Sequence, residues 1–193
     1  MTPEASARRS VLDGRALPDT ARARAVAAPF ATRFILRGGE DVAGPVGAAF
    51  GVEPPSRPLA SAAEGPRAAL WLGPDEWLLI AEDEPAELAL RLETALLGVF
   101  HALIDVSHRQ VAIEVAGPGA ARLLAAGVPL DLDMDGFPVG MATRTLLLKA
   151  EITLWRREAE RFWLDVARSF APYVAAALTQ SAADQGGGVE VAE

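Results

Sequence analysis

Two stretches of this chain follow the same order of predicted elements, and this repeat constrains the fold more than any other feature. Trp71 and Trp77 lie in apolar runs on either side of a turn at 73–76, which predicts a β-hairpin. Trp155 and Trp163 lie in a second predicted hairpin. A helix with an early proline is predicted after each hairpin. The first helix carries its leucines on one stripe: Leu88, Leu92 and Leu96.

A strand and a short helix precede each hairpin. Segments 32–36 and 46–50 form the first such pair, and 111–115 and 120–126 form the second. A strand at 102–106 closes the first half. The order therefore predicts an α+β fold, in which two ferredoxin-like β-α-β-β-α halves pack as one unit.

The repeat also divides the chain. Residues 29–106 form the first α+β half and residues 107–180 the second, so segment 104–125 is the joint that closes one half and opens the other. Residues 1–28 have few periodic apolar positions and predict a flexible N-terminal arm, which we expect to order only in a complex. Residues 181–193 predict a disordered tail. The proline-rich stretch 53–67 predicts an exposed loop.

Composition excludes several classes of protein. The chain has 193 residues, a net charge of −8 and no cysteine. Cysteine-based catalysis, thiolate metal sites and disulfides are thereby excluded, and the composition fits the cytoplasm. The negative charge argues against a nucleic-acid partner. No run of ~18 apolar residues predicts a membrane-spanning helix, and the arginine-containing N-terminus lacks the apolar segment of a signal peptide.

Two motifs have the partial form of known binding loops. Asp131, Asp133, Asp135 and Gly136 match the first half of a calcium loop, but Ala142 stands where the bidentate glutamate is required. An acidic surface loop is the favoured interpretation, and a calcium-responsive module is the alternative.

The elbow 117–119, Gly-Pro-Gly, follows a strand and opens a helix, as a dinucleotide-binding loop does. However, Arg122 replaces its third glycine, and Pro118 has no N–H to offer a phosphate. The elbow is therefore predicted to be structural.

The two histidines suggest two kinds of chemistry. His101, Asp105 and His108 have the residue types of a metal site, and Ser107 with His108 has those of a nucleophile and its base. Nothing in the spacing brings either set together, because neighbours in an extended segment point in opposite directions. We therefore expect no catalytic, cofactor-binding or metal-binding residue, and expect Asp105 and His108 to fix the joint.

The remaining candidates are cations and aromatic residues. Arg144, in a predicted strand, either clamps a carboxylate in bidentate fashion or faces water at a sheet edge. The tryptophans are expected in the core, with one of each pair partly exposed at a partner interface. The candidates for an interface or joint are Trp71, Trp77, Asp105, His108, Arg109 and Arg144.

The segment Asp105-Val106-Ser107-His108, with the strand and Gly117-Pro118 that follow, resembles the glycine cleavage T-protein superfamily of folate-associated proteins. Where that pattern continues with Met-Gly, this chain has Arg109-Gln110. A more specific resemblance covers about residues 9–180. Its segments are 70–80 (LWLGPDEWLLI), 105–107 (DVS), 127–132 (GVPLDL), 137–138 (FP), 142–146 (ATRTL) and 168–170 (RSF).

In these segments the chain is similar to the gamma subunits of heterotetrameric sarcosine oxidase, with Val128 in place of an expected cysteine. The resemblance implies a T-protein-like, folate-binding-domain-like fold and a non-catalytic scaffold role beside alpha, beta and delta subunits. The complex would convert sarcosine to glycine and pass the one-carbon unit to tetrahydrofolate, with FAD, FMN, NAD and tetrahydrofolate bound on other subunits. The alternative is a free-standing folate-binding or one-carbon (aminomethyl) transfer protein.

Overall fold

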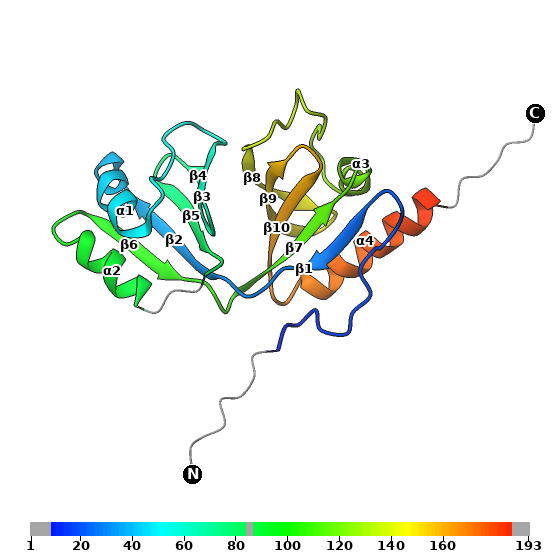
Figure 1. Cartoon of the computed structure of the whole chain (residues 1–193), viewed down its shortest axis with the longest axis horizontal. Coiled ribbons are helices and arrows are strands. Elements are labelled where there is room, and N and C mark those ends of the chain that lie inside the picture. Colours follow the sequence, from blue (N-terminus) through cyan, green and yellow to red (C-terminus); the bar gives the residue numbers. More distant parts are fainter. Residues whose placement is uncertain (1–8, 84–86, 187–193) are drawn as a thin grey trace, which may run out of the picture.

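The computed structural model describes residues 9–83 and 87–186. Two antiparallel sheets of five strands each form in this part of the chain, with strand orders β3-β4-β5-β2-β6 and β1-β7-β10-β9-β8. Figure 1 shows the sheets side by side, with α1 and α2 outside the first and α3 and α4 outside the second. The sheets define two lobes.

The first lobe runs from β2 to β6. Its elements are β2 (Thr32–Gly38), the 3-10 helix η1 (Glu40–Val42), α1 (Ala43–Phe50), β3 (Ser61–Glu64), β4 (Arg67–Gly73), β5 (Glu76–Ala81), α2 (Leu88–Ala95) and β6 (His101–Asp105). The second lobe runs from β7 to α4. Its elements are β7 (Gln110–Ala116), α3 (Ala120–Ala125), β8 (Ala142–Leu147), β9 (Ala150–Glu158), β10 (Arg161–Ala167) and α4 (Ala171–Gly186).

Both lobes have the predicted ferredoxin-like order. Each has one further strand beside its hairpin, which is β3 in the first lobe and β8 in the second. β6 closes the first sheet beside β2, as expected. The matching place in the second sheet, beside β7, is taken by β1 (Arg24–Ala27) from the N-terminal segment. The prediction that 1–28 is a flexible arm is therefore wrong for its described part. Leu12 is also buried in the second lobe's core, which anchors this segment further.

Two other boundaries also differ from the sequence-based expectation. α4 continues to Gly186, so the first part of the predicted disordered tail is helical, and the rest of the tail lies outside the described residues. Part of the expected loop at 53–67 forms β3, because Ser61–Glu64 pairs with the first four residues of β4. Pro85, expected in the first turn of α2, lies outside the described residues.

Three apolar clusters hold these layers together. One lies between the first sheet and α1 and α2, where Leu88, Leu92 and Leu96 are buried as the stripe predicted. A second lies between the other sheet and α3 and α4. The third lies between the sheets and includes Leu70, Leu78 and residues of β7, β9 and β10. The two lobes therefore form one α-β-β-α arrangement with a shared core.

The tryptophans confirm the hairpin repeat but not a residue-by-residue match. Trp71 lies opposite Trp77, and Trp155 lies opposite Trp163. The first pair faces α1 and α2, whereas the second pair lies between the sheets. The two hairpins are thus offset by one residue, which turns equivalent side chains to opposite faces.

A buried ion pair joins the two sheets. Arg33 of β2 and Asp165 of β10 are each about 1% exposed, and Arg33 Nε donates to Asp165 Oδ1 at 2.5 Å. Trp163 Nε1 donates to the other carboxylate oxygen, and Arg33 Nη1 donates to the Ala31 carbonyl at 3.0 Å. Burial raises the pKa of Asp165, and the positive charge of Arg33 opposes this rise. The pair joins the two lobes through two residues that are 132 positions apart in sequence.

Removing one member of this pair leaves the other charge buried without compensation. We expect Asp165→Asn to lower the free energy of unfolding by about 3–5 kcal/mol, measured by urea denaturation. Replacing both members, Arg33→Met with Asp165→Leu, is expected to restore most of that loss.

The matched control is Asp75→Asn, which breaks the exposed pair with Arg37. Exposed pairs contribute little to stability, because solvent screens them. A cost for Asp165→Asn as small as that of the control would contradict a structural role for the buried pair.

Candidate functional site

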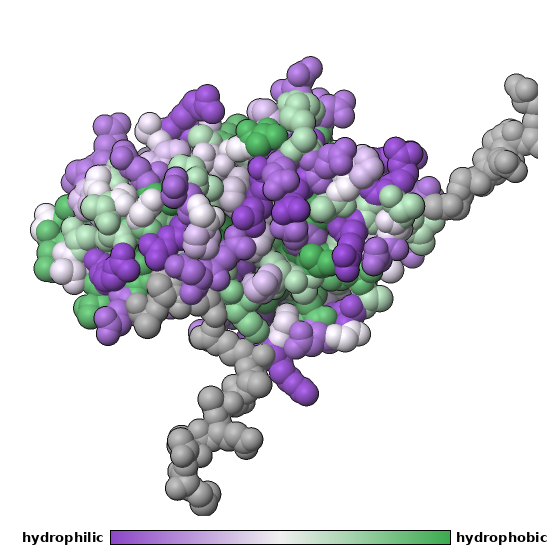
Figure 2. Space-filling view, viewed as in Figure 1, coloured by the Kyte–Doolittle hydropathy of each residue, from purple (hydrophilic) through white to green (hydrophobic). Residues whose placement is uncertain are grey.

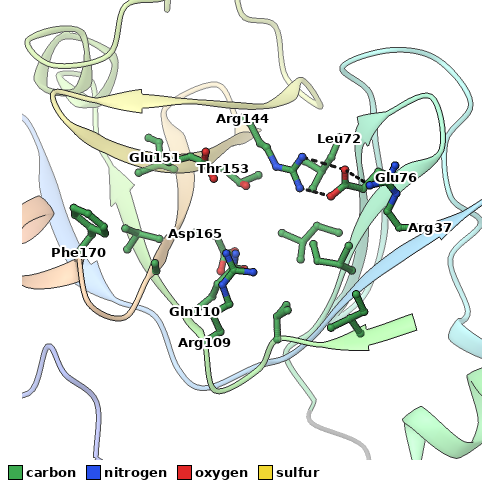
Figure 3. Close-up of a pocket in the computed structure, with 17 residues that line it drawn as sticks. Arg37, Leu72, Glu76, Arg109, Gln110, Arg144, Glu151, Thr153, Asp165 and Phe170 are labelled. Atoms are coloured by element: carbon green, nitrogen blue, oxygen red, sulfur yellow. Dashed lines mark hydrogen bonds and ion pairs between the residues drawn. The ribbon is translucent and has the colours of Figure 1, made fainter. Parts of the chain in front are cut away.

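A hollow lies between the two sheets. It is a cleft of about 430 Å³ that receives residues from β2, β5 and β6 of one lobe and from β8, β9 and β10 of the other. Its walls carry both apolar and charged side chains, and Val106, Arg109 and Gln110 of the joint line it. Figure 3 shows Arg109 at this joint and the pair of Arg144 and Glu76 farther along the cleft. A cleft between two lobes is the usual place to look for a ligand site.

One rim of the cleft is closed by an ion pair between the lobes. Arg144 of β8 donates from both terminal nitrogens to Glu76 of β5, with Nη1 at 3.1 Å from Oε2. Arg37 lies on the far side of Glu76 and bonds Asp75 at 2.7 Å. The hydrogen bond from Arg37 lowers the pKa of Asp75. The sequence left two interpretations for Arg144 open. Features of both are present: Arg144 is exposed on the edge strand β8, and it clamps a carboxylate that belongs to the chain itself.

The motif at 105–107 shapes the joint beneath the cleft. Asp105 Oδ1 accepts from the Ser107 N–H at 2.8 Å, and Ser107 Oγ accepts from the Arg33 N–H at 2.9 Å. Val106 N–H donates to the Arg33 carbonyl at 2.9 Å. Both backbone groups of Arg33 are thereby fixed by this motif, which orients its side chain toward Asp165. Ser107 is held as a structural hydroxyl rather than a nucleophile.

Neither histidine side chain takes part in these hydrogen bonds of the joint. His101 bonds the Val99 carbonyl at 2.8 Å and Glu93 at 3.2 Å, on the side of α2. His108 is exposed and makes no hydrogen bond with the described residues, so the expectation that it fixes the joint is wrong. No cluster of three metal-ligating side chains occurs in the described ranges. Arg109 lines the cleft, and its carbonyl accepts from the Arg168 N–H at 2.9 Å.

Two of the three carboxylates that line the cleft are held in ion pairs, whereas Glu151 is exposed and has no ion pair with the described residues. The buried acid of the cleft, Asp165, has both oxygens occupied by Arg33 and Trp163. A buried group with a shifted pKa marks a candidate site, but structural ion pairs produce the same shift. Glu76 is likewise held by Arg144. The arrangement fits a joint between lobes better than a reaction centre.

The acidic loop at 131–136 is organised by a buried arginine. Arg156 Nη1 donates to the carbonyls of Leu132 at 3.1 Å and Phe137 at 2.6 Å, and its guanidinium lies 4.7 Å from the Phe162 ring centroid. Burial lowers the pKa of Arg156. The inner side of this loop is therefore filled by a side-chain cation, which supports the acidic-loop interpretation.

The Gly-Pro-Gly elbow is filled in the same way. Gly119 N–H donates to the Arg22 carbonyl at 2.7 Å, and a Cβ on Gly117 would lie 2.6 Å from that oxygen. Gly117 also has φ +114°, which an L side chain rarely adopts. Glycine is required here because the N-terminal segment crosses the elbow. The groups that would cradle a phosphate instead contact the chain itself.

The tryptophans follow the predicted burial only in part. Trp71 is partly exposed and Trp77 is buried, as expected for one pair. Trp155 and Trp163 are both buried between the sheets, so the expectation of an exposed member is wrong for that pair. Among the six candidate interface or joint residues, Asp105, Arg109 and Arg144 lie around the joint and cleft. Trp71 and Trp77 lie elsewhere, and His108 lies within the joint but makes no hydrogen bond with the described residues.

This chain is similar in sequence to proteins of a known family. The profile of the sarcosine oxidase gamma subunit family matches residues 38–184. The chain belongs to the sarcosine oxidase gamma subunit family. The sarcosine oxidase subunit gamma of an Arthrobacter species is 41% identical over 112 residues, which are 58% of this chain and 54% of that protein. The matched part thus spans about half the length of that curated relative.

Two solved structures share the fold. A chain of the heterotetrameric sarcosine oxidase from Corynebacterium sp. U-96 matches with a TM-score of 0.83 and 27% identity, over 92% of this chain and 95% of that chain. Aminomethyltransferase T of the glycine cleavage system from Bartonella henselae matches with a TM-score of 0.62 and 16% identity, over 87% and 47%. These likenesses confirm the predicted T-protein-like unit for this gamma-subunit family member.

Sequence analysis missed the buried charges. Arg33, Asp165 and Arg156 each lie inside a predicted strand. Alternation assigns Arg33 and Asp165 to the face opposite the main apolar residues, whereas Arg156 shares a face with Ile152 and Leu154. Asp165 alone of the three has apolar residues on both sides, and this is the signal that could have identified it. No helix among the described residues is long and apolar enough to cross a membrane.

His101 generates a prediction about pH. The Val99 carbonyl raises the pKa of His101, and Glu93 adds to this effect. The folded state therefore favours the protonated ring. Its stabilisation is present below the unfolded pKa of about 6.5 and is lost as pH rises through the folded-state value.

We expect His101→Gln to lower Tm at pH 5.5 by about 2–4 °C more than at pH 9, measured by thermal unfolding. The matched control is His108→Gln at the exposed histidine. An equal loss for His101→Gln at both pH values would refute the effect.

Proposed function

We propose that this chain is a non-catalytic gamma subunit of a heterotetrameric sarcosine oxidase and acts as a scaffold for the flavin-bearing subunits. The observation that carries the proposal is the likeness to a chain of the heterotetrameric sarcosine oxidase, which covers 92% of this chain and 95% of that chain. Because the likeness extends over both lobes, it includes the surfaces that an assembly would use.

The geometry of the cleft supports a scaffold role. A general base or nucleophile must be free to exchange a proton with a substrate. The ionised groups that span the cleft are instead paired with each other, as Arg33 is with Asp165 and Arg144 with Glu76. These pairs connect the lobes and make the chain one rigid block for partners to bind.

In this proposal the partners are the alpha, beta and delta subunits, and the complex works in the cytoplasm. It oxidatively demethylates sarcosine to glycine and passes the one-carbon unit to tetrahydrofolate. FAD, FMN, NAD and tetrahydrofolate are bound by the other subunits, and this chain holds none of them. The filled elbow at Gly117 and Gly119 supports this division, because the Arg22 carbonyl occupies the space a dinucleotide phosphate would need.

Co-expression tests the proposal. When this chain carries an affinity tag and is expressed with the other three subunits from its own host, we expect all four to co-purify in equal amounts. We also expect the complex, and not the isolated chain, to oxidise sarcosine. The readouts are subunit ratio by gel densitometry, mass by light scattering and sarcosine-dependent oxygen uptake.

The opposite result has a clear form. If the chain eluted alone from this co-expression, the scaffold proposal would be wrong. If the isolated chain then bound tetrahydrofolate saturably in the micromolar range, followed by tryptophan fluorescence, the folate-binding alternative would replace it. The untagged complex serves as the control for effects of the tag.

A further inference from the structure

The outer strand of the first sheet has an unpaired edge. β6 pairs only with β2 in the part of the chain that the structure describes. Val106 N–H donates to the Arg33 carbonyl. Every second residue of β6, counted from Val106, therefore directs its backbone groups toward β2. The backbone groups of His101, Leu103 and Asp105 therefore point away from β2. An unpaired edge of this kind is a template for another strand.

Exposed apolar side chains lie at this edge. Phe100, directly before β6, is 92% exposed, and Leu97 is 78% exposed. Ile104, within β6, is 53% exposed. Figure 2 shows hydrophobic residues at the end of the first lobe, over α2 and the turn that leads to β6. Proteins usually protect such edges with charges or proline, and clustered apolar exposure marks an interaction site.

The surroundings of this edge are acidic. Gly38 lies beside the Phe100 carbonyl. Because η1 begins two residues after Gly38, it lies close to the exposed apolar residues of this edge. The exposed carboxylates on η1, α2 and β6 are Glu40, Asp41, Glu87, Glu93 and Asp105. Only Glu93 of these forms an ion pair with the described residues, through His101. The nearby Arg91 guanidinium is directed to the Ala49 carbonyl of α1.

This charge pattern selects the kind of partner. A second copy of the chain would bring the same carboxylates opposite one another, which costs energy at close range. A segment with lysine or arginine beside apolar residues would neutralise them. Strand addition supplies main-chain hydrogen bonds, while side-chain pockets and charges supply selectivity.

We propose that the β6 edge, formed by Leu97, Phe100 and β6, binds an extended segment of another oxidase subunit that carries apolar and basic residues. This inference rests on the proposed function and names the surface through which it operates. The segment adds as a strand to the first sheet, covers Phe100 and places its cations against Glu40 and Asp41.

The test uses the four-subunit co-expression with the tagged full chain. The double variant Leu97→Ser/Phe100→Ser is expected to raise the dissociation constant of this chain from the complex at least tenfold, measured by dilution and light scattering. The matched control is Val139→Ser/Leu146→Ser, at exposed apolar residues of the other lobe. Glu40→Lys/Asp41→Lys is expected to weaken binding and to reduce its dependence on salt.

Each outcome bears on one claim. Loss of binding in the β6-edge variant but not in the control supports the inference. Wild-type binding in the β6-edge variant overturns the inference and leaves the scaffold proposal intact. Failure of the wild-type chain to co-purify overturns both. An isolated chain that is dimeric, and becomes monomeric in Leu97→Ser/Phe100→Ser, shows that a second copy covers the edge and overturns the inference.

Discussion

The buried pair of Arg33 and Asp165 is the interaction on which the rest of this structure depends. Each lobe has its own core beneath two helices. The inner faces of the two sheets, however, are covered only by packing against each other. Arg33 crosses from one sheet to the other, and the motif at 105–107 fixes its backbone. A buried ion pair is weak evidence for net stability, because desolvation offsets its attraction. We infer that its value here is specificity, since the two charges are paired only when the sheets meet in this register.

Much of the fold was predictable because it depends on local periodicity. The hairpins, the helix stripe of Leu88 and Leu92, and the closing strand at 102–106 all follow from apolar spacing and turn residues. β1 was not predictable in this way. Four residues, Arg24–Ala27, carry too little periodicity to identify a strand, and their pairing with β7 is fixed by the edge that β7 exposes.

The candidate site was harder to predict, for a physical reason. Alternation separates the two faces of a strand, but it does not say whether the second face meets water or another sheet. Arg33 and Asp165 therefore had the pattern of solvent-facing charges. Arg144 shows the same limit, because the sequence left a carboxylate clamp and a water-facing edge position both open and did not indicate Glu76 as a partner. His108 shows the reverse case, where a residue next to a structural motif has no part in it.

The buried joint is expected to make the two lobes one cooperative unit, which is the unit proposed to bind the partner subunits. Native-state hydrogen exchange, followed by mass spectrometry over a series of urea concentrations, tests it most directly. The account predicts that amides of β2 in one lobe and β10 in the other exchange through a single opening with one free energy and one urea dependence. Separate openings of the two sheets, with the first lobe exchanging while the second stays protected, would contradict it.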